Sequence, residues 1–452
     1  MSASAFERGF AAAARRPSVP IVLGFAALIA VGTVLLMMPF SAESGEPTAL
    51  LPALFTATSA VCVTGLIVVD TPTYFSTAGE LIILGLIQLG GLGIMTVASL
   101  LSLLMFRRFG LRMRLTAQAE TKSLGLGDVR RMVTRVIGLS LLFELVVAVL
   151  LTARLLIGYR EPLGRAIYDG VFHAISAFNN AGFALRSDNL ISFATDPWFI
   201  LPICFAVIAG GLGFPVWVEI LRHLRSSRRW TMHARVTLLA TALLLVVGAV
   251  GTTLAEWSNP GTLGPMSWPA KLLAGFSTGV MPRTAGFNSL DVAAFHPGTL
   301  LLQDILMFIG GGSAGTAGGI KVTTFALLAF VILAEIRGEP TVHVMGRRLP
   351  ELVQRQALTI VLLGVAVVML TVLVLLAISP FGLDQVLFEA ISAFATVGLS
   401  TGITAQLPAF GQILLVLLMF IGRLGPITLA SALALRERAR RYELPEERPI
   451  VG

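Results

Sequence analysis

The stretch Glu389–Thr401, EAISAFATVGLST, has a close copy upstream at His173–Ser187, HAISAFNNAGFALRS. Both contain Ala-Ile-Ser-Ala-Phe and reach a glycine six residues after the serine. Looser copies stand at Ala57–Ile67 and at Phe276–Asn288, where the approach to the glycine is longer. A recurrence of this length predicts one structural unit that is used four times. The four loop glycines, 104 to 117 residues apart, are Gly65, Gly182, Gly286 and Gly398.

The composition places these units in a membrane. Of the 452 residues, 56% are hydrophobic and 13% are charged, and the mean hydropathy is +0.86. A soluble core cannot bury that much apolar surface. The net charge of +8 does not indicate nucleic-acid binding, because the cations stand between apolar segments. The two cysteines form neither a disulfide framework nor a metal-binding pattern, and we expect no cofactor held by this chain itself.

Each copy lies between two longer apolar segments. A helix that crosses a membrane needs about 20 apolar residues, and the copies themselves sit in shorter segments. The sequence therefore predicts four re-entrant half-helices, each followed by a loop that protein or water must cover. The short segments are Thr48–Val61, Ile167–Asn179, Lys271–Val280 and Gln385–Thr396. The predicted spans are Val19–Phe40, Leu81–Phe106, Val136–Thr152, Trp198–Val218, Val236–Leu254, a segment from Gln303 that Gly310–Lys321 interrupts, Ala357–Pro380 and Phe410–Leu435.

The predicted fold class is an all-α integral membrane protein with four pseudo-symmetric span, pore-helix, span units around one ion pore. It has eight transmembrane helices and four re-entrant pore helices. Because 25 of the 33 Lys and Arg residues lie outside the units, we expect both termini and all links to be cytoplasmic. The predicted divisions are a cytoplasmic N-terminus (1–18), repeat A (19–106), a link (107–135), repeat B (136–221), a link (222–235), repeat C (236–335) with a gating loop (310–321), a link (336–356), repeat D (357–435) and a cytoplasmic tail (436–452).

The glycine loops are suited to form an ion filter. Glycine adopts unusual dihedral angles without steric penalty, so a loop built on it can direct several carbonyl oxygens toward one axis. Four such loops make a ring of carbonyls, which replaces the hydration shell of a monovalent cation in potassium channels. For a single loop, a glycine that merely allows close helix packing is the alternative. The predicted potassium-binding residues are Val63, Thr64, Gly65, Asn180, Ala181, Gly182, Thr284, Ala285, Gly286, Thr396, Val397 and Gly398.

With these loops, a glycine-rich break in the third unit and Arg423 within IGRLGP, Ile421–Pro426, the sequence resembles the Trk/Ktr/HKT superfamily of potassium and sodium transporters. The resemblance covers Val19–Leu435 and is nearest to the Ktr-type membrane subunit, because Trk-type members carry two further spans before the first unit. It implies a homodimer whose protomers each hold a pore, and a cytosolic nucleotide-binding regulatory ring formed by another polypeptide. One departure is Gly279–Arg283, an unusual approach to the third loop glycine.

A glycine-rich run interrupts the second span of the third unit. Each glycine costs about 1 kcal/mol relative to alanine in a helix, so we expect this run to be a loop. We expect the loop to occlude the pore on the cytoplasmic side of the filter, with Arg423 anchoring it or adding an electrostatic barrier and Lys321 tethering its far end. The alternative is that the glycines only permit close packing. The predicted gate residues are Gly310, Gly311, Gly312, Ser313, Ala314, Gly315, Thr316, Ala317, Gly318, Gly319, Lys321 and Arg423.

Several other residues allow a functional and a structural interpretation. Lys321 is costly in an apolar span, and snorkelling to an interface is the alternative to a gating role. Glu144 and Asp304 are either ion relays or partners of a buried cation or hydroxyl. The runs Gly90–Gly93 and Gly210–Gly213 predict close helix packing.

Together these features predict the ion-conducting subunit of a potassium uptake system in the cell (inner or plasma) membrane, and no enzyme. The histidines are scattered and do not form metal spacings. Potassium is the expected ion, sodium dependence is left open, and nucleotide acts only through a partner subunit. The expected partners are a second copy, the regulatory ring and membrane lipid. A sodium-coupled or sodium-selective secondary transporter is the alternative, although coupled transporters are built from inverted repeats and these units all begin and end on one side.

Overall fold

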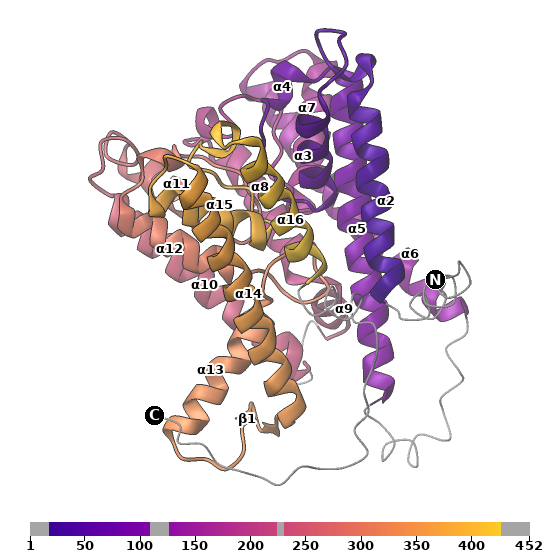
Figure 1. Ribbon diagram of the computed structural model, residues 1–452, viewed down its shortest axis with the longest axis vertical. Helices are drawn as coiled ribbons and strands as arrows, with labels where there is room; N and C mark the ends of the chain where they lie inside the picture. The colour runs from indigo at the N-terminus through magenta and orange to yellow at the C-terminus, as the bar shows by residue number, and fades with distance from the viewer. Residues whose placement is uncertain (1–17, 109–125, 224–229, 426–452) are drawn as a thin grey trace.

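A computed structural model describes residues 18–108, 126–223 and 230–425 (Figure 1). The first unit begins with α2, which carries no charged residue and exposes large apolar side chains such as Val31 and Val34. Such a surface is suited to lipid. Figure 1 shows α2 and α5 side by side, and the two helices are in contact. The elements are α2 (Ser18–Met37), the 3-10 turn η1 (Pro39–Ser41), α3 (Leu50–Val61), α4 (Thr71–Tyr74) and α5 (Thr77–Arg108).

The second unit contains a break within a long apolar stretch. The predicted span Trp198–Val218 is not one continuous helix, because α8 ends at Leu212 and the chain turns by 96° into the next helix. Gly213 at the bend has φ +90°, and a Cβ there would lie closer than 3.0 Å to the Ser313 oxygen. The close approach of another segment and the helix-breaking Pro215 both favour the break at this position. The elements are α6 (Leu126–Gly158), α7 (Leu163–Phe178), η2 (Ile191–Phe193), α8 (Pro197–Leu212) and α9 (Phe214–Arg222).

The third and fourth units follow the same order of helices. In the third, the glycine-rich run separates α12 from α13, and a single bridge pairs Ile309 with Ile320. In the fourth, residues 426–435 of the predicted last span lie outside the described residues. The elements of the third unit are α10 (Met232–Glu256), α11 (Trp268–Val280), η4 (Val292–Ala294), α12 (Pro297–Phe308) and α13 (Val322–Ile336). Those of the fourth are α14 (Glu351–Ile378), α15 (Leu383–Ala395), η5 (Thr404–Gln406) and α16 (Ala409–Leu424).

A small hairpin lies between α13 and α14, where an all-α fold predicts none. Strand β1 (His343–Val344) pairs antiparallel with β2 (Arg347–Arg348). The two turn residues, Met345 and Gly346, have φ +48° and +79°, as two-residue hairpin turns require. Val344 is buried in a small apolar cluster. The all-α prediction is therefore wrong for this short segment.

The four units pack in a closed ring. Within each unit, the first helix contacts the short helix and the second helix. Each short helix also contacts the second helix of the preceding unit: α7 packs on α5, α11 on α8, α15 on α12, and α3 on α16. The last of these contacts joins the beginning of the chain to its end. The repeat in the sequence is thus also a repeat in the packing.

Four of the described helices are long and apolar enough to cross a membrane. They lie within α2, α6, α10 and α14, so the first helix of every unit fits its predicted role. The bent pair α8 and α9 counts as a fifth candidate. In the other units the described second helices are shorter apolar helices: α12, α13, α16 and the Thr77–Gly93 part of α5. The count of eight spans stays a prediction.

Candidate functional site

The four loop glycines lie together at the centre of the ring. Each glycine faces the carbonyl oxygen that precedes the glycine of the next loop, and an added Cβ would lie closer than 3.0 Å to it. These pairs are Gly65 with the Ala181 oxygen, Gly182 with Ala285, Gly286 with Val397 and Gly398 with Thr64. The last pair closes the circle. The structure therefore brings the predicted filter residues of all four loops together.

Every loop uses the left-handed backbone conformation twice. The loop glycines have φ between +71° and +97°. The residue two positions earlier is also left-handed, with φ between +50° and +69°, although none of these residues is glycine. Such residues persist only where the surrounding structure fixes them, and they cluster at functional sites. A packing role for single glycines does not account for this shared path. The non-glycine residues are Val63, Asn180, Thr284 and Thr396.

A serine on each short helix helps to shape three of the loops. The N–H before the loop glycine donates to a serine carbonyl, at 2.7 Å for Ser59, 2.8 Å for Ser176 and 2.8 Å for Ser392. The Ser59 and Ser392 hydroxyls also accept the glycine N–H, at 3.0 and 3.1 Å. Because these bonds need a fixed spacing, they explain the serine that stands six residues before the glycine.

The third loop is built differently, as its sequence predicts. Ala285 N–H donates to the Met281 carbonyl at 3.0 Å, so a serine carbonyl does not take this role. Arg283 in the same loop is buried, and its Nε and Nη1 have no hydrogen-bond partner among the described residues. Its carbonyl accepts from Asn180 Nδ2 of the second loop at 3.3 Å. The ring nevertheless closes through this loop, because the glycine contacts are the same as in the others.

A pocket of about 360 Å³ lies on the side of the ring toward which the chain leaves the loops. The four loop glycines all line it, together with residues that follow them. Its charged side chains are Asp70 and Arg186. Asp70 accepts hydrogen bonds from Thr73 at 2.7 Å and from Ser187 at 2.6 Å. The four loop glycines therefore open on a pocket that carries one acidic and one basic side chain.

The glycine-rich run between α12 and α13 lies against two of the loops. Thr316 Oγ1 donates to Asn180 Oδ1 at 2.8 Å, next to the second loop glycine. A Cβ on Gly318 would clash with the Thr396 hydroxyl of the fourth loop. The run also contacts the second unit near the bend at Gly213, where Gly312 N–H donates to the Gly211 carbonyl at 2.7 Å. All predicted gate residues in the run thus belong to a segment that touches the filter loops.

Arg423 and Lys321 both hold this run. The Arg423 side chain is buried on α16, and its Nη1 donates to the Thr316 carbonyl. Its Nη2 donates to the Gly90 carbonyl of α5 at 3.3 Å. Lys321 Nζ donates to the Ala317 carbonyl at 2.5 Å. This bond joins two residues at the C-terminal end of the run. One buried guanidinium therefore joins the first, third and fourth units.

The sequence left open whether Glu144 and Asp304 are ion relays or structural partners, and the structure shows where both side chains lie. Glu144 accepts from Gln88 at 3.0 Å and from Asn179, beside the second filter loop, at 3.2 Å. This network joins α5, α6 and the end of α7, so Glu144 is a structural partner there, although sequence reasoning missed Gln88 and Asn179. Asp304 is buried, and its Oδ1 has no partner among the described residues.

The glycines of the runs 90–93 and 210–213 pack closely, as predicted, with two exceptions. A Cβ on Gly90 would clash with the Val61 carbonyl, and one on Gly210 with the Phe178 carbonyl. Each glycine therefore lets a second helix approach the end of a short helix, directly before a filter loop. A Cβ on Gly93 would meet no atom within 4 Å, and one on Gly211 would meet only Asn180 Nδ2 at 3.7 Å, so packing does not require glycine at these two positions.

The family model for TrkH, described as a cation transport protein, matches residues 3–440. The chain belongs to the TrkH cation transport protein family. The Ktr system potassium uptake protein B of Bacillus subtilis is 39% identical over 94% of each chain. Its namesake in Vibrio alginolyticus is also 39% identical, over 96% of this chain and 94% of the relative. The potassium/sodium uptake protein NtpJ of Enterococcus hirae is 36% identical over 96% of each.

The fold of this TrkH-family chain is also that of a solved transporter. The crystal structure of the potassium transporter TrkH from Vibrio parahaemolyticus superposes with a TM-score of 0.72, at 18% identity, over 92% of this chain and 84% of that one. The family resemblance seen in the sequence is thus confirmed. The chain is a membrane transporter and not an enzyme, as predicted.

Proposed function

We propose that this chain is the ion-conducting subunit of a Ktr-type potassium uptake system. The closed ring of four left-handed glycine loops carries the proposal, because a ring of backbone carbonyls replaces the hydration shell of potassium. The names of the relatives from Bacillus subtilis and Vibrio alginolyticus support the same ion. The proposed ligands are the backbone carbonyls of the twelve predicted filter residues.

The proposed pore runs through the centre of the ring, within eight spans and four re-entrant helices. The short helices α3, α7, α11 and α15 all end directly before a filter loop. Their C-terminal ends carry the negative end of the helix dipole, which favours a cation nearby. Four such ends around one axis add to the attraction of the carbonyls.

The glycine-rich run is the proposed gate. Its contacts with Asn180 and Thr396 put it against the filter on the side away from the pocket mouth. Arg423 holds it there through the Thr316 carbonyl. A segment with few side chains and many glycines can move aside at small steric cost. We propose that its displacement opens the pore.

The proposed orientation in the membrane and the proposed partners are those expected from the sequence. In Figure 1 the end of α5, the end of α13 and the start of α14 lie at the same end of the molecule, opposite α4. We propose that this end is cytoplasmic, that the protein sits in the cell membrane as a homodimer, and that a nucleotide-binding ring of another polypeptide regulates it. The relatives' names, which describe one protein of a Ktr system, support the separate partner.

A sodium-coupled or sodium-selective transporter is the second candidate. It is favoured by one relative, which is named as a potassium/sodium uptake protein and matches this chain over 96% of its length. The two candidates differ in what drives uptake. A pore needs only the membrane potential, whereas a coupled transporter needs a sodium gradient.

Tracer flux into liposomes tests the proposal. The purified full-length chain is reconstituted with potassium inside, an inside-negative potential is set, and uptake of rubidium is followed while external potassium and sodium are varied separately. We expect rubidium uptake that potassium inhibits more strongly than sodium. Protein-free liposomes give the background. Absence of rubidium uptake contradicts the proposal, and uptake that requires a sodium gradient favours the second candidate.

A further inference from the structure

Serines of the short helices fix three of the filter loops up to the glycine, and other contacts fix the residues that follow the glycine. We call the six residues after each loop glycine its trailing segment: 66–71, 183–188, 287–292 and 399–404. These segments line the pocket mouth and continue directly from the proposed ion ligands. A carbonyl ring keeps its diameter only if both ends of each loop are fixed. The contacts of the trailing segments are therefore relevant to selectivity.

In the fourth unit a buried carboxylate holds the trailing segment. Glu389 on α15 is fully buried. Its Oε1 accepts from the Ser400 hydroxyl and from Thr401 N–H at 3.1 Å, and its Oε2 accepts from the Thr404 hydroxyl at 2.9 Å. All three donors follow Gly398 within six residues. One side chain of the short helix thus fixes the whole trailing segment.

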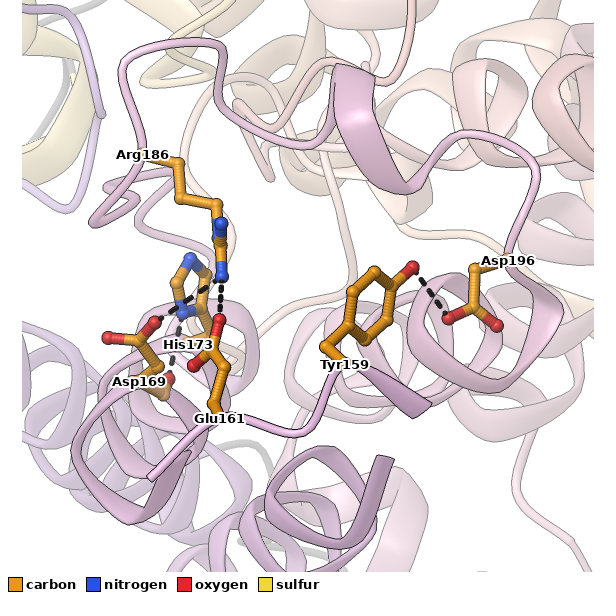
Figure 2. Close-up of polar contacts among 6 residues, drawn as sticks. All are labelled: Tyr159, Glu161, Asp169, His173, Arg186 and Asp196. Atoms are coloured by element: carbon orange, nitrogen blue, oxygen red, sulfur yellow. Dashed lines mark hydrogen bonds and ion pairs between the residues drawn. The ribbon is translucent and has the colours of Figure 1, made fainter. Parts of the chain in front are cut away.

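In the second unit ion pairs hold the trailing segment, and here the trailing segment carries the charged residue that reaches back, an arginine. Arg186, four residues after Gly182, donates to Glu161 Oε1 at 2.5 Å and lies 3.7 Å from Asp169 Oδ2. Figure 2 shows the Arg186 side chain pointing from its loop toward these two carboxylates, of which Glu161 precedes α7 and Asp169 lies within it. His173 stands at the position of Glu389 in the repeat, but its Nδ1 is bonded to the Asp169 carbonyl.

In the other two units no charged side chain joins the trailing segment to the short helix among the described residues. Asp70 of the first trailing segment instead accepts from Ser187 of the second one at 2.6 Å. In the third, the Ser277 hydroxyl of α11 pairs with the Ser289 hydroxyl of the trailing segment at 2.5 Å. In the first, Thr56 takes the position of Glu389, and its hydroxyl has no partner among the described residues. Because the loops contact one another in chain order around the ring, the second and fourth face each other. The charged attachments therefore lie on opposite sides of the filter.

We propose that Glu389 and Arg186 are positioning residues that fix the width of the filter and so determine the preference for potassium over sodium. The inference rests on the proposed function. Hydrogen bonds to an ionised group are shorter and about twice as strong as neutral ones. Two such attachments on opposite loops hold the ring along one diameter. Neither side chain serves as an ion ligand itself. Glu389 is buried among its three donors, and Arg186, which lines the pocket mouth, is itself a cation.

The first test replaces the charge and keeps the shape. In the liposome assay, Glu389→Gln should lower the ratio of potassium to sodium inhibition on the order of tenfold, the equivalent of about 1.4 kcal/mol. Glu389→Asp, which keeps the charge, should restore part of the ratio. Arg186→Gln should lower it less, because Arg186 is partly exposed to water. Rubidium uptake itself should persist in all three variants.

The chain offers matched controls for both residues. Glu256 is a buried carboxylate with four donors, which are Asn259, Thr262, Thr299 and the His296 N–H. None of them lies in a filter loop. Arg154 pairs with Asp196 at 2.7 Å, away from the trailing segments; Figure 2 shows Asp196 beside Tyr159. Glu256→Gln and Arg154→Gln should lower thermal stability and leave the ion ratio unchanged.

A second pair of variants keeps the test decisive if Glu389→Gln does not fold. Ser400→Ala and Thr404→Val each remove one donor while Glu389 stays in place, and each should lower the ratio about threefold, or about 0.65 kcal/mol. Unchanged ratios in these variants and in Glu389→Gln, with a lowered ratio in Gly398→Ser, overturn the inference and leave the proposed function intact. A parent chain that does not distinguish the two ions overturns both.

Discussion

The glycine ring is built from four similar loops, whereas the structure next to it on the side away from the pocket comes from single units. In the ring itself, the four loops share one backbone path, with the same left-handed residues and the same glycine-to-carbonyl contact. On the side away from the pocket, only the third unit supplies the glycine-rich run, and only the fourth unit supplies an arginine that bonds to it, Arg423. No fourfold arrangement exists there among the described residues.

This difference fits the two tasks proposed for the pore. An ion on the axis is bound best when ligands surround it evenly, which four equal loops provide. A gate needs two arrangements of one segment, and a single loop with its own anchor supplies them without disturbing the other units. Changes in the ring should therefore alter selectivity, whereas changes in the run or its anchor should alter flux.

The largest effect is expected from Gly398→Ser. The new Cβ would clash with the Thr64 carbonyl, and a left-handed backbone costs a residue with a side chain about 1–2 kcal/mol. The potassium-over-sodium ratio in the liposome assay should fall more than about tenfold. Gly85→Ser is the control, because a Cβ there meets no atom within 4 Å. An unchanged ratio in Gly398→Ser would rule out the carbonyl filter.

Removal of residues 313–318 should chiefly raise flux. The deletion takes away Thr316 and the chain that lies against the filter loops. Rubidium uptake should rise about fivefold with the ion ratio retained, as expected when a barrier falls by about 1 kcal/mol. Deletion of residues 44–46, an exposed turn between η1 and α3, controls for the shortening. A folded deletion variant that conducts no faster than the parent would place the gate elsewhere.

Substitution of Arg423 separates an anchor from an electrostatic barrier. Arg423→Ala should raise uptake about threefold, or about 0.65 kcal/mol, because the run loses its bond to the fourth unit. If the side chain acts as an anchor, Arg423→Lys should also raise uptake, since lysine lacks the guanidinium fork that reaches the Thr316 and Gly90 carbonyls together. Low uptake in the lysine variant would instead indicate a charge barrier. Arg355→Ala, at an exposed position on α14, is the control.

The smallest effect is expected from Thr316→Val. The valine keeps the volume and removes the hydroxyl that donates to Asn180 Oδ1, the side-chain bond between the run and the second filter loop. Uptake should rise less than about twofold, corresponding to about 0.4 kcal/mol, with little change in the ion ratio. Thr359→Val on the exposed side of α14 is the matched control. A large loss of selectivity would show that the run also shapes the filter.

Much of the architecture could be predicted from the sequence, because it depends on local properties. Long apolar runs fix the first helix of each unit, even in the second unit, where Glu144 lies within the run. The serine and glycine spacing fixes the loops, because both partners of the Ser59 and Ser392 bonds lie within six residues. The longer approach to Gly286 likewise predicts a loop with different hydrogen bonds. These features need no distant partner.

Only the tertiary structure decided which distant groups meet. Gly213 and Pro215 are a local signal for the break in the second unit, but nothing near them in the chain reveals that Ser313 packs against the bend. Arg423 bonds to carbonyls that lie 107 and 333 residues away. Glu389 and His173 stand at the same place in the repeat, yet one holds a trailing segment and the other does not. The sequence determined the four units and their loops, since local spacing and backbone preference suffice for them. Packing around the ring decided the contacts between units, because a long-range contact exists only once the helices that carry its two groups have met.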